Sequence, residues 1–469
     1  MKDDARSGLA FLTRSVLLAL GFACAYQLLN LADWHEDYGL LGWALAAAFA
    51  MAALALLYLA LRLPWPVARR ITAELLAVGA ALVLAEVAIA ILMPSPDDRD
   101  AARIRAAERL GLPFDTRSLS EVVADLRSRG VDAYPRLGGV WAQIPAVRRR
   151  LPEDLYVLSH ASNVTVVECN ESGKYHTFRT DELGFNNPPG LVSAGNIDIA
   201  LVGESYVLGH CLPTAQSLAG RIRARYPRTA NFGFAGIHTL TELGVFREYV
   251  EPLRPRIVIW AINPNFVAAA QDMRDPLLPR YLDAGYSQGL ARRQPEIDRL
   301  VREIAIPVQE KLDAEAKIRA EQSQKQRLLE AWRLPEIRNR LGRVALAKAP
   351  AGLGVNLTVF RQSLALARDA AEGWGGKLVV VLLPIYAEVV AHQIGGNLAH
   401  HNLAREVGEL GIPVVNGVEL FEQMEDPAAL FTLRINNHPN ADGYALLAGR
   451  VLEEIRTHES GSWMAGAKR

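Results

Sequence analysis

The chain has 469 residues, half of them apolar, and its 51 basic and 51 acidic side chains give a formal net charge of zero. This length is sufficient for two or three domains, one of which could be a large α/β unit. The balanced charge argues against a general nucleic-acid binder, because such proteins usually carry a basic face or stripe. We therefore expect no nucleic-acid partner.

The first 93 residues contain three long apolar segments, at about 15–31, 40–61 and 75–93. Each is close to the ~20 residues that a helix needs to span a bilayer. A signal peptide is the alternative for the first segment, but its apolar region would be only about 7–15 residues long, and two more apolar segments follow. The sequence thus predicts a membrane anchor of three transmembrane helices over residues 1–93.

The charges of the connecting loops predict the orientation of this anchor. The loop between the first two spans is acidic and the loop between the last two is basic, with Asp33, Glu36 and Asp37 in the first and Arg62, Arg69 and Arg70 in the second. By the positive-inside rule, the amino terminus lies in the cytoplasm, and three crossings place everything after Met93 outside the membrane. The expected location is the inner membrane, with the remaining chain in the periplasm.

Two further segments are distinguished by composition. Residues 94–158 are polar and begin with a Pro- and Asp-rich boundary, which predicts a stalk or docking segment. Residues 159–469 alternate strand and helix patterns, interrupted at about 271–343 by a charged helical insertion. We interpret this insertion as a solvated helix on the domain edge, with a lid or a partner surface as the alternatives.

A buried strand is predicted where the apolar run 197–202 ends in Gly203, Glu204 and Ser205. A serine at the carboxyl end of the first strand of an α/β sheet lies where such sheets bind ligands. The Gly-x-Ser-x-Gly elbow of α/β-hydrolases does not fit, because the second glycine is Gly209 and position 207 is Val. Together with the distant His438, the serine supplies the groups needed for acyl transfer.

The segment 203–209 resembles the first block of the SGNH/GDSL hydrolases, with Glu204 where that family usually has Asp. Three further segments resemble the other family blocks in the same order: 231–239 with Gly236, 257–265 with Asn265, and 436–444 with His438. The third block is degraded, and Asn263 is the next choice for its asparagine. Four ordered blocks over residues 160–456 are more specific than any one of them.

This resemblance implies a three-layer, SGNH-type (flavodoxin-like) α/β domain with a parallel sheet. It also implies that Ser205 is the nucleophile and His438 the base. The backbone N–H groups of Ser205 and Gly236 and the Asn265 side-chain amide would hold the oxyanion. No cofactor is implied.

One expected residue is missing from the fourth block. The family usually carries an Asp two or three residues before the histidine, to orient the imidazole. This chain has Asn436 and Ile435 there, so the orienting group is absent or comes from elsewhere. Asn436 through its oxygen, or Glu204, could substitute.

The chain has three cysteines, and none has the spacing of metal ligands, so no metal is expected. Cys169 and Cys211 both lie outside the membrane in the predicted topology, where disulfides can persist. Cys211 follows Ser205 by six residues. A disulfide and two free thiols both stay open at this point, because the sequence does not give the Cα separation.

These observations predict a membrane-anchored, extracytoplasmic esterase or O-acyltransferase that acts on acyl esters, such as acetyl esters, of an envelope glycan. A stretch at 181–187 with Asp181, Gly184, Phe185 and Asn187 is similar to one in SGNH-like proteins of bacterial surface-polysaccharide systems. A transferase would need a larger membrane partner to supply its acyl donor. The alternative is a catalytically inactive SGNH-like protein that binds glycan or serves envelope assembly.

Overall fold

The structure is a computed structural model. It describes residues 64–92, 99–139, 144–264, 267, 272–331, 357–392, 400–435 and 438–466, together with 13–16 and single positions or pairs between 50 and 62. The chain divides into two compact units, Met1–Ser95 with Glu321–Ala349, and Pro96–Ala320 with Pro350–Arg469. The second unit contains both sheets of the described chain.

The larger sheet has five parallel strands in the order β5-β4-β6-β7-β8. The strands are β4 (Ile199–Gly203), β5 (Thr229–Gly233), β6 (Ile257–Ile262), β7 (Lys377–Leu382) and β8 (Val414–Asn416). In order of appearance this is the 2-1-3-4-5 arrangement of flavodoxin-like sheets. The predicted α/β class with a parallel sheet is therefore confirmed.

The strands of this sheet are buried on both faces, which explains their continuous apolar sequences. In β4, Ala200 and Val202 face one apolar cluster, whereas Ile199 and Leu201 face the other. Fully burying one such Val, Leu or Ile side chain contributes ~1.5–3 kcal/mol. The alternation therefore fixes the register of β4 between two helical layers.

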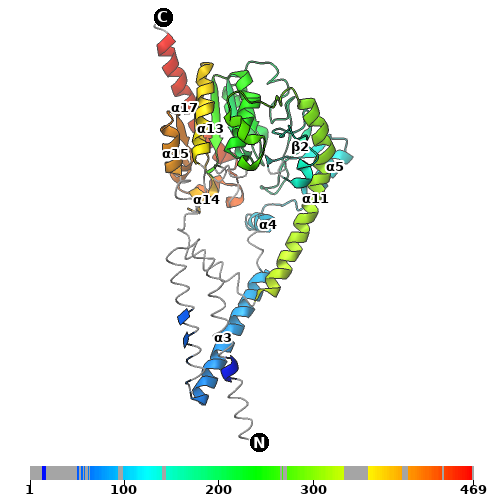
Figure 1. Cartoon of the computed structure of the whole chain (residues 1–469), viewed down its shortest axis with the longest axis vertical. Helices are drawn as coiled ribbons and strands as arrows, with labels where there is room; N and C mark the ends of the chain where they lie inside the picture. Colours follow the sequence, from blue (N-terminus) through cyan, green and yellow to red (C-terminus); the bar gives the residue numbers. More distant parts are fainter. Residues whose placement is uncertain are drawn as a thin grey trace. The chain divides into compact units, whose positions relative to one another are not determined.

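Helices cover both faces of the sheet (Figure 1). One layer contains α10 (Thr239–Val245), α13 (Leu357–Gly373) and α15 (His400–Gly408), and the other contains α9 (Leu218–Arg225), α16 (Gly417–Glu422) and α17 (Ala441–Gly466). Phe360 and Leu364 of α13 belong to the first cluster, and Leu447 and Val451 of α17 to the second. The three layers position the carboxyl ends of the strands at one edge.

A smaller sheet precedes the large one in the chain. It consists of β1 (Ala133–Pro135), β2 (Thr165–Val167) and β3 (Thr177–Arg179), with β1 parallel and β3 antiparallel to β2. Two helices, α4 (Arg99–Arg109) and α5 (Leu119–Ser128), come before it. Val122 and Val123 of α5 pack with β1 and β2, so part of the segment 94–158 belongs to the same compact unit as the large sheet.

The predicted insertion contains one long helix, α11 (Gln294–Leu329). Its first turns are packed in the core through Ile297, Val301 and Ile304, and its later residues are mostly exposed. The remaining described elements are short: α7 (Pro145–Arg148), α8 (Ser205–Leu208), α14 (Tyr386–Val389), the π-helix η3 (Phe246–Val250), and the 3₁₀ turns η2 (Thr214–Gln216), η4 (Glu251–Leu253), η6 (Asp272–Arg274), η7 (Leu278–Leu282), η10 (Pro427–Leu430) and η11 (Thr432–Arg434).

Among the described residues, one helix is long and apolar enough to cross a membrane, α3 (Trp65–Leu92). Only 11% of its most apolar stretch is buried, unlike the core helix of a soluble protein. It contains most of the third predicted span and begins ten residues earlier than expected. Most of the first two predicted spans lies outside the described residues.

Candidate active site

Ser205 lies at the first position of α8, directly after β4. Strands β4 and β6 are neighbours, while the chain from β4 leads next to β5 on the other side, so Ser205 lies where the strand order reverses. Such a reversal is where open α/β sheets bind their ligands. The turn closes at Gly209, whose φ of 86° is left-handed and favours glycine. The chain is thereby turned sharply around an almost buried serine.

His438 lies in the connection that precedes α17 and reaches Ser205 across the sheet edge. Its Nε2 is 2.7 Å from Ser205 Oγ. Its backbone carbonyl accepts hydrogen bonds from the N–H and hydroxyl of Thr432, both at 3.1 Å. The imidazole also packs against the rings of Tyr206 and His210, with centroid distances of 4.4 and 4.6 Å. The two side chains that the sequence analysis paired, Ser205 and His438, thus lie within hydrogen-bond distance of each other.

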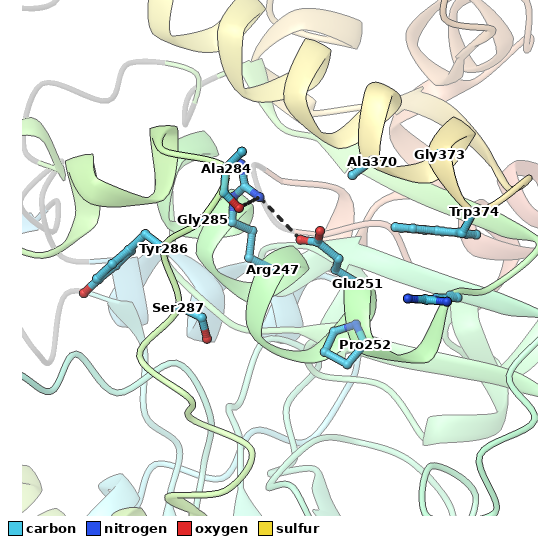
Figure 2. Close-up of a pocket in the computed structure, with 11 residues that line it drawn as sticks. Arg247, Glu251, Pro252, Ala284, Gly285, Tyr286, Ser287, Ala370, Gly373 and Trp374 are labelled. Atoms are coloured by element: carbon cyan, nitrogen blue, oxygen red, sulfur yellow. Dashed lines mark hydrogen bonds and ion pairs between the residues drawn. The ribbon is translucent and has the colours of Figure 1, made fainter.

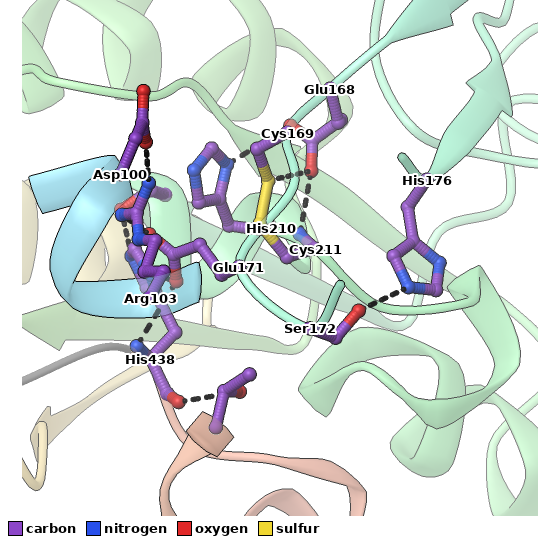
Figure 3. The surroundings of a disulfide bond; sticks show 12 residues. Asp100, Arg103, Glu168, Cys169, Glu171, Ser172, His176, His210, Cys211 and His438 are labelled. Atoms are coloured by element: carbon purple, nitrogen blue, oxygen red, sulfur yellow. Dashed lines mark hydrogen bonds and ion pairs between the residues drawn. A yellow bond between two sulfur atoms is a disulfide. The ribbon is translucent and has the colours of Figure 1, made fainter. Parts of the chain in front are cut away.

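Glu171 is the carboxylate that orients this histidine. His438 Nδ1 lies 2.8 Å from Glu171 Oε2, and the His438 backbone N–H donates to the same oxygen at 3.3 Å (Figure 3). The other oxygen accepts from Arg103 Nη2 at 2.7 Å. A carboxylate at His438 Nδ1 thus comes from the connection between β2 and β3, the source elsewhere in the chain that the sequence left open, and Glu204 does not contact this nitrogen among the described hydrogen bonds. Asn436 itself lies outside the described residues.

The charges of the triad support one another. Burial opposes the charged imidazolium, but the negative charge of Glu171 and its hydrogen bond outweigh this effect, and the pKa of His438 is raised above 6.5. Burial likewise opposes the Glu171 carboxylate, but the charges of His438 and Arg103 and the hydrogen bond from His438 hold the pKa of Glu171 well below its usual range. Glu171 is thus ionised whenever His438 has to take up a proton.

Glu204 makes contacts that the sequence did not predict. Its Oε2 accepts the Ser205 N–H at 2.6 Å and is also hydrogen-bonded to Ser205 Oγ. Its Oε1 accepts from Tyr206 N at 3.4 Å and from Asn263 Nδ2 at 3.3 Å. The Ser205 N–H, expected to hold an oxyanion, is therefore occupied by the preceding side chain. An Asp side chain at this position would be one methylene shorter and would not extend as far.

Of the other two predicted oxyanion donors, Gly236 lies among the described residues and Asn265 does not. Gly236 follows β5 in a left-handed turn with a φ of 67°, and its N–H makes no hydrogen bond to any described residue. Asn265, our choice for the third block, lies outside the described residues. The neighbouring Asn263 is described and buried, and it supports Glu204.

The stretch 181–187 contacts the turn formed by Ser205–Gly209, which we call the serine turn. Asp181 accepts hydrogen bonds from the Phe185 N–H and the Asn187 amide, which closes the loop on itself. Asn186 then donates to Leu208 O at 2.9 Å, and Asn187 bonds both the N–H and the carbonyl of Asn231 in β5. These contacts give the stretch a structural role.

Cys169 and Cys211 form a disulfide beside the triad, with a Cα separation of 5.4 Å (Figure 3). This decides between the two states that the sequence left open. Two groups of described residues bring possible metal ligands within 4.8 Å of one another: the two cysteines with His210, and Glu171 with His210 and His438. The cysteines of the first group are bonded to each other, and the second group is engaged in hydrogen bonds of the site.

A separate pocket contains none of the triad residues (Figure 2). Arg247, Glu251 and Trp374 contribute to its lining, and Arg247 donates to Glu251 at 3.4 Å and to the Ala284 carbonyl at 3.2 Å. Arg247 and Glu251 precede β6 in the chain and Trp374 precedes β7, so they flank the amino ends of these strands, whereas Ser205 follows the carboxyl end of β4. We assign no chemistry to this pocket.

Sequence reasoning missed Glu171 because family blocks are read near the histidine. A signal was nevertheless present, because Glu171 follows Cys169 by two residues and Cys211 follows Ser205 by six. Pairing the two cysteines would have brought both Glu168 and Glu171 toward the serine turn.

No family model matches the chain, and no curated protein matches it. Two of the solved structures that resemble it belong to one named family. One is a protein assigned to the lipolytic G-D-S-L family from Desulfitobacterium hafniense DCB-2, with 13% identity and a TM-score of 0.31 over 55% of this chain and 98% of the other. The second is a member of the lipolytic G-D-S-L family from Veillonella parvula DSM 2008, with 13% identity and a TM-score of 0.30 over 55% and 97%. Because both scores are below 0.5, the site of this chain is interpreted from its own geometry.

Proposed function

We propose that the chain is a serine ester hydrolase or O-acyltransferase of the SGNH type, with Ser205, His438 and Glu171 as its triad. The observation that carries this proposal is the chain of two hydrogen bonds, 2.7 Å from Ser205 Oγ to His438 Nε2 and 2.8 Å from His438 Nδ1 to Glu171. A nucleophile within hydrogen-bond reach of a base, with the base held by a third group, is the arrangement that acyl transfer requires.

In the proposed first step, His438 Nε2 takes the proton of Ser205 as Oγ bonds to the carbonyl carbon of an ester. Glu171 keeps the proton of the imidazole on Nδ1 and stabilises the imidazolium that forms. The tetrahedral intermediate then collapses, the bond to the leaving alcohol breaks, and His438 returns a proton to that alcohol. An acyl-serine remains. Water or a sugar hydroxyl, deprotonated by the same histidine, releases the acyl group and restores the serine.

The Gly236 N–H and the Asn265 amide are the proposed oxyanion donors. One such donor is worth ~2.7–4 kcal/mol in the transition state. The Ser205 N–H would join them only after Glu204 releases it. Glu204 would therefore slow the proposed reaction by keeping one oxyanion donor occupied.

We further propose that the enzyme is anchored in the inner membrane and acts outside the cytoplasm on acyl esters of an envelope glycan, with a membrane partner as acyl donor if it is a transferase. The length and apolar character of α3 support the anchor, as do the basic residues Arg62 before this helix and Arg69 and Arg70 in its first turns. An envelope glycan is proposed because the predicted topology places the site outside the cytoplasm. The inactive binding-protein alternative was motivated by the absent acid and by the degraded third block. Glu171 supplies a carboxylate at His438 Nδ1 and removes the first motive, whereas Asn265 of the third block lies outside the described residues.

A serine-directed fluorophosphonate probe tests the proposal directly. We expect labelling of the full chain, hydrolysis of a short-chain ester, and loss of both in Ser205→Ala. Ser193→Ala is the matched control, because Ser193 is exposed and its hydrogen bonds go to Glu182 and Gly190, not to the triad. His438→Ala should also abolish ester hydrolysis. If the wild type took no probe and was as inert as Ser205→Ala on short esters and acetylated sugars, catalysis would be abandoned for the binding function.

A further inference from the structure

The disulfide joins the two segments that carry opposite ends of the triad. Cys169 precedes Glu171 by two residues, and Cys211 follows Ser205 by six. Cys169 belongs to the connection after β2, in the small sheet, whereas Cys211 follows β4 and α8 of the large sheet. The bond is almost buried, since 8% of Cys169 and 2% of Cys211 is exposed. It is thus a covalent link between the acid and the nucleophile.

The strands that flank the Glu171 loop pack on the large sheet through Val166 and Phe178, whereas the loop itself meets the serine turn and its flanks through few contacts, chiefly those of Glu168 and the disulfide. The flanking strands β2 and β3 have three residues each and pair only within the small sheet. Arg103 binds Glu171 itself, and Asp115 bonds the neighbouring Gly173, but both come from the segment before the small sheet. Within the loop, the disulfide is the covalent constraint that fixes its distance from the serine turn.

The polar contacts around the disulfide tie the same two segments. Glu168 Oε2 accepts the Cys211 N–H at 2.9 Å, and Glu168 Oε1 lies 3.2 Å from His210 Nδ1. His210 in turn packs on the ring of His438. Cys211 has a φ of 59°, a left-handed conformation that non-glycine residues seldom adopt. These contacts depend on the position of Cys211, which the sulfur–sulfur bond fixes.

We propose that Cys169 and Cys211 are positioning residues, whose disulfide holds Glu171 Oε2 at His438 Nδ1 and makes turnover depend on the oxidised state. The inference rests on the proposed function. A dithiol reductant would give two electrons and two protons to the sulfur–sulfur bond, forming two thiols and becoming a disulfide itself. A misplacement of about 1 Å in a catalytic group can cost about 100-fold in rate. We expect a loss of this size on reduction.

The pKa of His438 depends on the charged groups that face it, so its titration is a second readout of where Glu171 lies. These groups are Glu171 and Glu168 from the small-sheet segment, and Glu204, Tyr206 and His210 from the serine turn and its flanks. If Glu171 moves away, the imidazolium loses its main partner and burial dominates. The midpoint of His438 titration should then move to lower pH.

The test compares Cys169→Ser and Cys211→Ser with Cys24→Ser, a control for the remaining cysteine, in the full chain. We expect the first two to lower kcat about 100-fold and to shift the acid limb of the pH profile to lower pH, with the control unchanged. In a Glu171→Gln background the same cysteine substitutions should have little further effect. An equal loss in both backgrounds, or an unchanged pH profile, would overturn positioning through Glu171.

A measurement without turnover separates this inference from the proposed function. Hydrogen–deuterium exchange at the His438 ring, followed by mass spectrometry against pH, reports its titration in oxidised, reduced and reoxidised wild-type protein. A lower midpoint on reduction that recovers on reoxidation supports positioning even if no ester is cleaved, and an identical midpoint refutes it. If Cys169→Ser and Cys211→Ser do not fold, this measurement on reduced wild-type protein still tests the inference.

Discussion

Glu171 and His438 are 267 residues apart in the sequence, yet a carboxylate oxygen of the first lies 2.8 Å from Nδ1 of the second. The histidine comes from the last part of the α/β unit and the acid from a loop of the small sheet that precedes this unit. In the block pattern that the chain resembles, both groups lie within a few residues of each other. The same hydrogen bond is therefore made here from two separate parts of the fold.

The first prediction concerns replacement of Glu171 by Gln. Glu171→Gln should lower kcat by up to about 10⁴-fold, the effect of the Asp→Asn change in a serine protease, because the amide can hold the wrong imidazole tautomer. The measurement is hydrolysis of a short-chain ester. Glu153→Gln, which changes an exposed carboxylate, is the control and should have no effect.

The substitution Asn436→Asp tests whether Asn436 or Glu171 orients His438. If Asn436 faced His438 Nδ1, a new carboxylate there would raise kcat. Because Glu171 already occupies Nδ1, we expect kcat to stay unchanged. A clear increase would show that Asn436 takes part in orienting the base.

The pH dependence follows from the charges around His438. The base must be neutral to accept the Ser205 proton, so activity is lost as His438 becomes protonated at low pH. Because the pKa of His438 is raised, the acid limb of kcat/KM should have its midpoint above pH 6.5 in the wild type. In Glu171→Gln the main raising charge is gone and burial dominates, so the midpoint should fall. A midpoint that stays in place would argue against Glu171 as the partner.

Shortening Glu204 tests its effect on the oxyanion donor. Glu204→Asp removes one methylene, and its carboxylate should no longer reach the Ser205 N–H, which frees this donor. We expect kcat to rise, by up to about 100-fold if the donor is fully recovered. Glu204→Gln keeps an acceptor oxygen at the same reach and should show no such rise. A loss of activity in the Asp variant would instead make Glu204 a required group.

Reporter fusions test the predicted membrane topology. Alkaline phosphatase folds with its disulfides only outside the cytoplasm. A fusion after residue 100 should be active, and a fusion between the second and third predicted spans inactive. The reverse pattern would place the triad in the cytoplasm, which is incompatible with an envelope substrate.

The sequence by itself determined the large sheet and one half of the site. Apolar runs such as those of β4 and β7 are long enough to be buried on both faces, and their pattern is local. Ser205 and Gly209 define a turn through residues that are adjacent in the chain, and His438 is recognisable beside its own helix start. The tertiary structure decided the rest. Glu171 meets His438 from a loop that Arg103 contacts and that the disulfide joins to the flank of the serine turn, and Glu204 meets the Ser205 N–H through its own side-chain conformation. Contacts between segments this far apart in the chain are set by tertiary packing, which the spacing of residues in the sequence does not predict.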